Sequence, residues 1–479
     1  MKRELILTRE LVLTVAAMLV VAGPVAGQDV VQLTTPGQVE RKGAEQEPEK
    51  EAEKQPEKQP SDKSGEKTAK EKRKQSDADW GFRWADRPSL RLGPGTRVDF
   101  RLRLQGDLQN SDAPLSDAGD NDDRGGSSLD VARRRIGIEG EILNIFDYQV
   151  ERELGTERDP WRDVYLNYKQ YDFAQVQVGK FKQPFSLDEN TSATNLDFVH
   201  RSRIAALLAP GRDRGAMVHG RVLRRGMLRY ELGLFSEDGS NARTNDTELV
   251  HGDRTLAGRL LVQPFRSTTS LASDLAFGVS FTASDVPEGV PNLRGRTELG
   301  AWFYRPDVLV NGQRQRIGVE ARWRPGPFSI KSEYIRLTDE RLGQSVDETD
   351  LSPFLGTGWY VSGTWAVTGE KKADGLDTPR RPLFQGGFGA VELAGRVERI
   401  RFGSVARRMN DSPASADPRA EVILGNSDRV YTFGVNWYAN RWIKIQTNLV
   451  RNTIAFPDQG PMPSQSSFWS RIVRFQFSM

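Results

Sequence analysis

The sequence contains no cysteine and only three histidines in 479 residues. A disulfide framework and a cysteine-ligated metal site are therefore excluded, and a histidine-rich metal site is disfavoured. Hydrophobic residues make up only 37% of the chain, and the mean hydropathy is −0.58. That is little apolar material for one large globular core. The net charge of +3 is small beside 68 basic and 65 acidic side chains, so the overall charge points to no particular partner.

Long apolar runs are also absent, apart from one at the N-terminus. A basic start, the apolar run 11–22 and the small residues 25–27 follow one another in the order of a secretory signal peptide. We therefore expect residues 1–27 to be removed on export. The alternative, a membrane anchor, is disfavoured because the run is shorter than the roughly 20 residues that a spanning helix needs.

Residues 41–80 have a composition that does not favour folding. They carry eleven basic and eleven acidic side chains, three prolines and no apolar periodicity. Such a segment buries too little apolar surface to become ordered. We predict that residues 28–90 are a disordered, charged linker on the periplasmic side of an ordered domain over 91–479. Contact with envelope polymers is the functional alternative to a solvated spacer.

From residue 97 onward, polar and apolar side chains alternate over stretches of five to thirteen residues, as in a two-faced β-strand. Clusters of Gly, Asp, Asn and Pro separate these stretches, and no helical pattern intervenes. The seventeen stretches that show the alternation are 97–109, 131–142, 148–153, 164–168, 174–179, 216–222, 227–235, 255–262, 275–281, 299–303, 316–324, 329–337, 359–368, 390–402, 431–438, 443–451 and 469–477.

The repeated strands predict an antiparallel all-β fold. In a soluble sandwich their apolar faces would meet in one core, whereas in an outer-membrane barrel they would face lipid. The strand lengths suit a tilted membrane crossing, and aromatic pairs near strand ends, such as Trp359-Tyr360 and Trp437-Tyr438, suit interfacial girdles. We predict a transmembrane antiparallel β-barrel of sixteen strands, with eighteen as the alternative, because such barrels have even strand numbers.

A barrel of this width encloses a water-filled lumen, which makes a pore the default function. The parity of the alternation predicts that Arg101 and Arg103 face inward from the first strand, and that Arg133 and Arg135 do so from the second. Rings of arginine in a pore favour anions. The alternative is that each arginine forms a lumen ion pair and binds nothing. Further inward basic residues are predicted at Arg229, Arg259, Arg316, Arg322, Lys444 and Arg474.

The stretch 171–215 begins as a strand but continues, after residue 182, as an irregular polar segment. It is too long for a tight hairpin, and long ordered loops tend to be functional. It carries the hydroxyl residues Ser186, Thr191, Ser192 and Thr194, and then Arg201, Arg203, Arg212 and Arg214.

Several short segments of the predicted barrel carry a family resemblance. They are RRRIGIEG at 133–140, DYQV at 147–150, VGKFKQPF at 178–185, the pair Arg201-Ser202, Thr368-Gly369-Glu370, and YTFGVNWYAN at 431–440. In their order and spacing they resemble the phosphate-selective porin O and P family of Gram-negative outer membranes, over most of residues 90–479.

The resemblance implies a homotrimeric, anion-selective channel of sixteen strands, narrowed by the loop after Gly179. It implies anion contacts at Arg133 and at Arg135 or Arg134, with hydroxyl donors at Thr191 and Ser192. Two loop arginines, Arg201 and Arg203, join them as pore-lining candidates. Phosphate-selective members are expected to carry lysine in the constriction loop. This loop holds Lys182 but also the acids Asp188 and Glu189, which would repel phosphate.

The leading hypothesis is therefore passive, anion-preferring diffusion through an outer-membrane porin, with phosphate or polyphosphate as solute. A weakly selective general porin is the first alternative, and a barrel that tethers envelope layers through residues 28–90 is the second. A barrel hydrolase is disfavoured because His200, His219 and His251 show no triad pattern beside a nucleophile. We expect outer-membrane lipid and inorganic anions as partners, and neither a cofactor nor a nucleic acid.

Overall fold

The computed structural model describes residues 80–84, 87–113, 128–156, 159–242, 253–289, 293–376, 378–404, 414–457 and 466–479. The predicted signal peptide, and the part of the predicted linker from 28 to 79, lie outside the described residues. Within the described residues, no helix is both long and apolar enough to cross a membrane.

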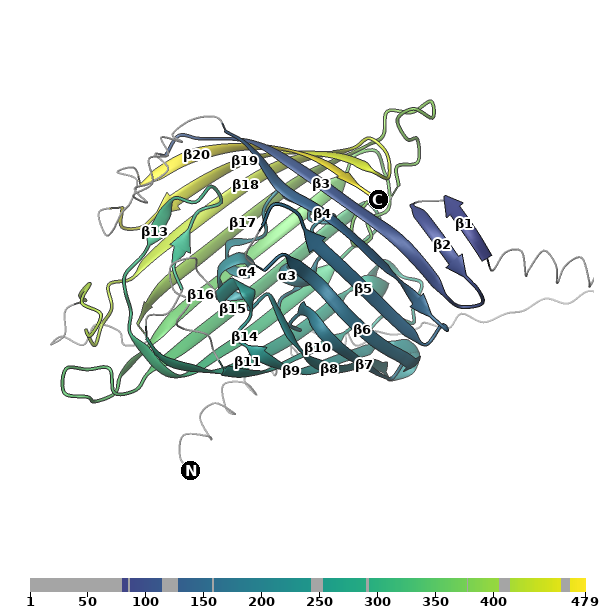
Figure 1. The fold of residues 1–479 in the computed structure, drawn as a ribbon. Coiled ribbons are helices and arrows are strands. Elements are labelled where there is room, and N and C mark those ends of the chain that lie inside the picture. Colours follow the sequence, from purple (N-terminus) through teal and green to yellow (C-terminus); the bar gives the residue numbers. More distant parts are fainter. Residues whose placement is uncertain are drawn as a thin grey trace, which may run out of the picture. The chain divides into compact units, whose positions relative to one another are not determined.

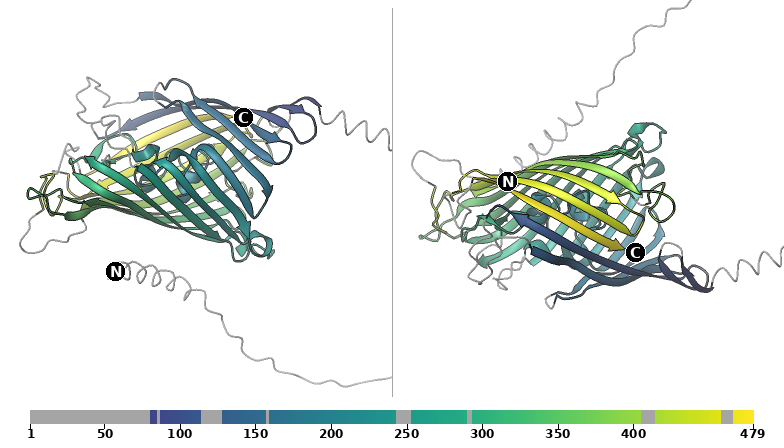
Figure 2. Two further views of the ribbon diagram at one scale, coloured as in Figure 1. Left: turned by 60° about the horizontal axis from the view of Figure 1, so that its bottom comes forward. Right: turned by 90° about the horizontal axis from the view of Figure 1, so that it is seen from above.

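The alternating stretches form sixteen antiparallel strands of one closed barrel, drawn in three views in Figures 1 and 2. Both the all-β prediction and the strand number of sixteen are confirmed. The barrel strands are β3 (Arg97–Ser111), β4 (Ser128–Ile142), β5 (Phe146–Glu153), β6 (Trp161–Tyr171), β7 (Ala174–Lys182), β8 (Arg212–Val222), β9 (Leu228–Glu237), β10 (Asp253–Val262), β11 (Ala276–Gly289), β14 (Val310–Trp323), β15 (Phe328–Arg341), β16 (Leu351–Ala366), β17 (Ala390–Ser404), β18 (Asn426–Tyr438), β19 (Ile443–Ile454) and β20 (Ser467–Ser478).

The barrel closes where β20 pairs with β3, so that its first and last strands are neighbours. In this seam Arg474 lies opposite Asp107 and Gln476 lies opposite Gln105. The Arg474 guanidinium donates two hydrogen bonds to the Asp107 carboxylate, at 2.7 and 2.6 Å. Because of this closure, each of the sixteen strands pairs with a neighbour on both sides, as a membrane-spanning sheet requires.

The burial pattern explains the alternation in the sequence. In β3 the side chains of Asp99, Arg103 and Asp107 are buried inside the barrel, whereas Phe100 and Leu104 are exposed on its outside. Successive side chains of a strand point to opposite faces. A strand between a polar lumen and an apolar outer surface must therefore alternate polar and apolar residues. The inward direction predicted from parity is confirmed for buried Arg259, Arg316, Lys444 and Arg474.

One of the seventeen alternating stretches, 299–303, does not enter the barrel. Its residues contribute to a short hairpin of β12 (Gly295–Arg296) and β13 (Trp302–Tyr304), in the connection between β11 and β14. The side chains of β13 are buried against protein: the Tyr304 ring stacks on Phe354 and Phe402, with centroids 6.0 and 5.0 Å apart. Because all three residues of β13 are buried, the sequence alternation here does not correspond to one lipid face and one polar face.

Two strands precede the barrel. β1 (Trp80–Trp84) and β2 (Pro88–Leu92) pair as a hairpin, and β2 continues onto β3, with Ser89 opposite Asp99. Described strand structure thus begins at Trp80, whereas composition places the end of the linker at residue 90. The reason is local, since three aromatic residues in WGFRW follow directly on the charged segment and favour strands.

The two ends of the barrel differ in their connections. At the turn end, most connections are short, such as 143–145, 172–173 and 439–442. At the loop end they are longer, and the connection between β7 and β8, residues 183–211, is the constriction loop. It contains the short helices α3 (Leu187–Asn190) and α4 (Arg203–Leu208) and lies inside the barrel (Figure 1). Three-residue or four-residue 3-10 turns occur at Arg224–Gly226, Ser240–Ala242 and Leu271–Asp274.

Candidate functional site

The constriction loop holds its own shape through local hydrogen bonds. The hydroxyl of Ser186 caps α3 by accepting from the Glu189 amide at 3.1 Å, and the hydroxyl of Ser202 caps α4 by accepting from the Ala205 amide at 3.3 Å. The Asn190 side-chain amide donates to the Phe185 carbonyl at 2.7 Å. Caps of this kind satisfy the free amides at a helix start, so the loop is an ordered element inside the lumen.

Helix α4 packs on the inner wall at the loop end of the barrel. Ile204 and Leu208 join Ile335, Phe354 and Phe402 in a buried apolar cluster. Gly356 of β16 permits this approach, because a Cβ atom there would lie 2.8 Å from the Leu208 side chain. The sequence alone does not reveal this inner apolar surface, since lumen positions are expected to be polar.

Basic side chains of β17, β19 and β20, the far wall of the lumen, bind the backbone of the constriction loop. Lys444 donates to the Leu196 carbonyl at 2.7 Å, Arg474 to the Val199 carbonyl at 2.6 Å, and Arg396 to the His200 carbonyl at 3.1 Å. Arg316 likewise donates to the Leu208 carbonyl at 2.8 Å. Several inward basic residues therefore position the loop in addition to contributing charge.

A buried ionic cluster fixes the middle of the loop. The Asp197 carboxylate accepts from Lys331 at 2.7 Å and from Lys372 at 2.8 Å, and Lys372 also pairs with Glu392. Burial by itself would raise the pKa of Asp197, but the two ammonium groups outweigh it and hold that pKa below its ordinary value. Asp197 thus stays ionised and ties the loop to β15 and to the connection after β16.

The two predicted acids of the loop are engaged within it. Asp188 accepts from the Ser202 amide at 2.7 Å, at the start of α4. Glu189 is 6% exposed, and its carboxylate lies 3.1 Å from the Arg201 guanidinium. Of the two carboxylates, only that of Glu189 is paired with a cation, so the repulsion of phosphate by Asp188 and Glu189 stays a prediction.

Lys182 also serves the loop. Its ammonium group donates to the carbonyls of Glu189 and Thr191, the latter at 3.0 Å. Thr191 donates its hydroxyl to the Leu187 carbonyl at 2.8 Å, and the Ser192 hydroxyl lies 3.0 Å from that of Thr194. Both hydroxyls line lumen cavities and retain acceptor capacity.

Glu189→Lys is expected to increase anion preference while weakening the fold. The substitution turns one negative charge into a positive one, but it also breaks the pair with Arg201 and places a cation beside Lys182. Losing one partner of a buried pair costs about 3–5 kcal/mol. Reversal potentials and thermal unfolding of the barrel measure the two effects, with Glu189→Gln as the isosteric control. An unchanged unfolding midpoint would contradict the buried position of Glu189.

Most predicted pore arginines pair with glutamates. Glu151 serves three of them, at 3.7 Å from Arg101, 3.8 Å from Arg103 and 3.2 Å from Arg135, which also pairs with Glu153. Arg101 has a second partner in Glu139, and in α4, Arg203 lies 3.3 Å from Glu298. The lumen ion pairs weighed as the alternative thus occur, but three guanidinium groups share Glu151.

Arg133 differs from the other predicted arginines. Its guanidinium donates to the Gln105 side-chain oxygen at 2.6 Å, and within the described ranges it pairs with no carboxylate. The charges with the largest electrostatic effect on it belong to other arginines, Arg474, Arg135, Arg201 and Arg103. Arg134, the alternative contact, is exposed on the outside of β4 and cannot line the pore.

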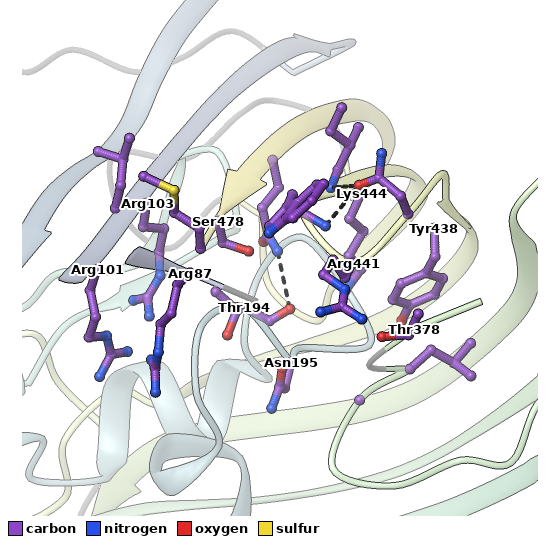
Figure 3. Close-up of a pocket in the computed structure, with 18 of the residues that line it drawn as sticks. Arg87, Arg101, Arg103, Thr194, Asn195, Thr378, Tyr438, Arg441, Lys444 and Ser478 are labelled. Atoms are coloured by element: carbon purple, nitrogen blue, oxygen red, sulfur yellow. Dashed lines mark hydrogen bonds between the residues drawn. The ribbon is translucent and has the colours of Figure 1, made fainter. Parts of the chain in front are cut away.

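A lumen cavity of about 420 Å³ opens near the turn end (Figure 3). Arg87, Arg101 and Arg103 lie on one side of it and Arg441 and Lys444 on the other, with Thr194 of the loop between them. Among the described residues that line it, these five basic side chains face one acid, Glu151. Sequence reasoning missed Arg87 and Arg441, because a hairpin before the barrel and a turn carry no alternation that assigns a face.

A closed sixteen-stranded barrel with an apolar outer surface, a charged lumen and a loop folded into it is the architecture of an outer-membrane porin, a channel and not an enzyme. The profile of the family described as phosphate-selective porin O and P matches residues 98–454. The chain belongs to this family, which confirms the resemblance seen in the sequence.

Individual relatives are distant. Porin O of Pseudomonas aeruginosa is 21% identical over 390 residues, which cover 74% of this chain and 82% of that protein. Among solved structures, a loop-deletion mutant of OmpT, an outer membrane protein of Vibrio cholerae, is 12% identical with a TM-score of 0.50. The match covers 81% of this chain and all of that one. At this identity the structural likeness supports the fold alone.

Proposed function

We propose that this porin passes anions in preference to cations, and that phosphate or polyphosphate is its solute. The observation that carries the proposal is Arg133, an inward guanidinium whose described partners include no carboxylate and whose main electrostatic neighbours are four further arginines. Guanidinium groups present a fork of donors that matches phosphate oxygens. A cluster of one sign in a narrow lumen also concentrates its counter-ions.

The cavity near the turn end supports the same direction. Among its described lining residues, five basic side chains outnumber one acid and would draw anions towards the constriction loop, where Thr191 and Ser192 offer hydroxyl groups. A weakly selective general porin remains the second candidate. It is favoured by the many Arg–Glu pairs of the wall, which cancel charge locally.

Reversal potentials of single channels under a potassium chloride gradient test the proposal. We expect the sign that indicates chloride permeation, and a reduction of chloride current by millimolar phosphate. A reversal potential near zero would favour the general porin, and cation preference would refute the proposal. Polyphosphate added to one side only, at constant chloride, tests whether longer phosphate chains also enter.

We also propose a homotrimer with the N-terminal segment in the periplasm. The family resemblance supports the trimer. The segment's position is supported by β2, which joins β3 at the turn end of the barrel, since outer-membrane barrels carry their short turns on the periplasmic side.

A further inference from the structure

A group of arginines faces away from the pore, on the outer surface near the loop end of β15 to β20. In β17 the outward side chains change from Leu393 and Val397 to Arg399 and Arg401 towards that end. Neighbouring strands show the same change. The exposed, outward arginines of this surface are Arg336, Arg399, Arg401, Arg429, Arg451 and Arg471.

Three of them form the outer arginine group: Arg399, Arg401 and Arg429. Arg399 lies directly opposite Arg429 in the ladder between β17 and β18, and Arg401 is two residues further along the same face. None of the three forms an ion pair with a carboxylate in the part of the chain that the structure describes. Like charges placed opposite each other destabilise a sheet, so an anion shared between them would remove a cost.

Other outward arginines of the surface already have local partners. Arg471 lies 2.9 Å from the Asp112 carboxylate. Arg451 lies over the Trp469 ring, with its guanidinium carbon 5.3 Å from the centroid. Among the described residues Arg336 and Arg451 also pair with no acid, so the outer arginine group is distinguished by the direct juxtaposition of Arg399 and Arg429 on adjacent strands together with its lack of an acid.

Aromatic residues define the depth of this group in the membrane. Trp359 of β16 lies directly opposite Arg399, and Tyr334 of β15 lies opposite Trp359. Tyr431 follows Arg429 on the outer face of β18. Tyrosine and tryptophan belts lie at the level of lipid headgroups. Because the longer loops of outer-membrane barrels face outward from the cell, these arginines lie at the headgroups of the outer leaflet.

We propose that Arg399, Arg401 and Arg429 bind the phosphate groups of a phosphorylated lipid of the outer leaflet. Neighbouring strands lie about 4.8 Å apart, so the long side chains of Arg399 and Arg429 can both donate paired hydrogen bonds to the oxygens of one phosphate. Trp359 and Val397 beside them supply apolar surface for the attached acyl chains. A second copy of this chain is a poorer partner, because two faces of like charge repel.

Lipid binding by the purified full-length barrel in a neutral detergent tests this site. The probes are lipid A with both phosphates and the same lipid after dephosphorylation. We expect the triple variant Arg399→Gln, Arg401→Gln, Arg429→Gln to bind the phosphorylated lipid about a hundredfold more weakly, or about fivefold for each arginine. Arg471→Gln, whose charge Asp112 already balances, is the matched control and is expected to change affinity less than twofold.

Equal affinity of the native barrel for both lipids, or unchanged binding by the triple variant, would overturn the proposal. Full displacement of lipid by inorganic phosphate would instead assign the group to a free anion. A change of assembly size without a change in lipid affinity would assign it to a protein contact. Unaltered single-channel conductance shows that the triple variant is folded. A variant with Arg399→Lys and Arg429→Lys keeps the two charges and is expected to bind the phosphorylated lipid more tightly than the triple glutamine variant.

Discussion

Arg133→Gln is expected to reduce the ratio of anion to cation permeability by about fivefold. A unit charge about 4 Å from a permeating ion contributes about 1 kcal/mol even in water, and Arg133 has no carboxylate partner among the described residues to offset it. Its amide replacement removes the charge and keeps a polar hydrogen-bond donor at this position of the lumen. Reversal potentials in chloride and in phosphate measure the change.

The neighbouring residue supplies the control. Arg134→Gln changes the same side chain on the same strand, but on the exposed outer face of β4. Its reversal potential is expected to equal that of the native protein. Equal loss of selectivity in both variants would show that the overall charge of the barrel, and not an inward arginine, determines which ion passes.

Asp197→Asn is expected to loosen the constriction loop and to raise single-channel conductance. The substitution removes the shared partner of Lys331 and Lys372, which are both buried. Leaving a buried charge unpaired costs about 3–5 kcal/mol, so the loop is expected to leave the far wall part of the time. The conductance trace should become larger and noisier, and the unfolding midpoint should fall.

Asp350→Asn is the control for this variant. Asp350 accepts from the Gly343 amide at 3.1 Å in an exposed connection between β15 and β16, so its loss is expected to leave conductance unchanged. Native conductance in Asp197→Asn would mean that the backbone contacts of Lys444, Arg474 and Arg396 hold the loop without the ionic cluster.

The direction of the pKa shift gives the pH dependence of this anchor. Because the pKa of Asp197 is held below that of an unfolded aspartate, its stabilising contribution is complete above the unfolded value, near 3.9. It is lost as the pH falls through the depressed folded value. The Asp197 anchor is therefore expected to persist in mildly acidic solution.

Much of the fold could be predicted because one physical rule governs it. A strand between lipid and water must alternate, and this predicted seventeen candidate strands and the inward faces of Arg135, Arg259 and Arg474. The rule of even strand numbers then reduced the seventeen to sixteen. The alternation rule fails at residues 299–303, because Ala301, Trp302 and Phe303 are all buried and the segment has no lipid-facing side. An alternating sequence therefore does not by itself show that a segment lies between lipid and lumen.

The candidate site could be predicted less completely, because partners come from register and from loop backbone. Glu151 meets three arginines only because β3, β4 and β5 lie side by side in one particular register. Carbonyl acceptors such as those of Leu196 and Val199 have no sequence signature at all. The sequence therefore predicts which charges face the lumen, but not which of them is free to meet an anion.

The seam between β3 and β20 also bears on assembly. Gln105 and Gln476, whose side chains hydrogen bond across it, are 371 positions apart in the chain. Contacts of such long sequence separation form late, and until then both strands expose unpaired amides that other chains can capture. The barrel therefore gains protection from aggregation when this seam closes, and we expect variants that weaken the Arg474–Asp107 pair to reduce assembly yield before they alter the finished pore.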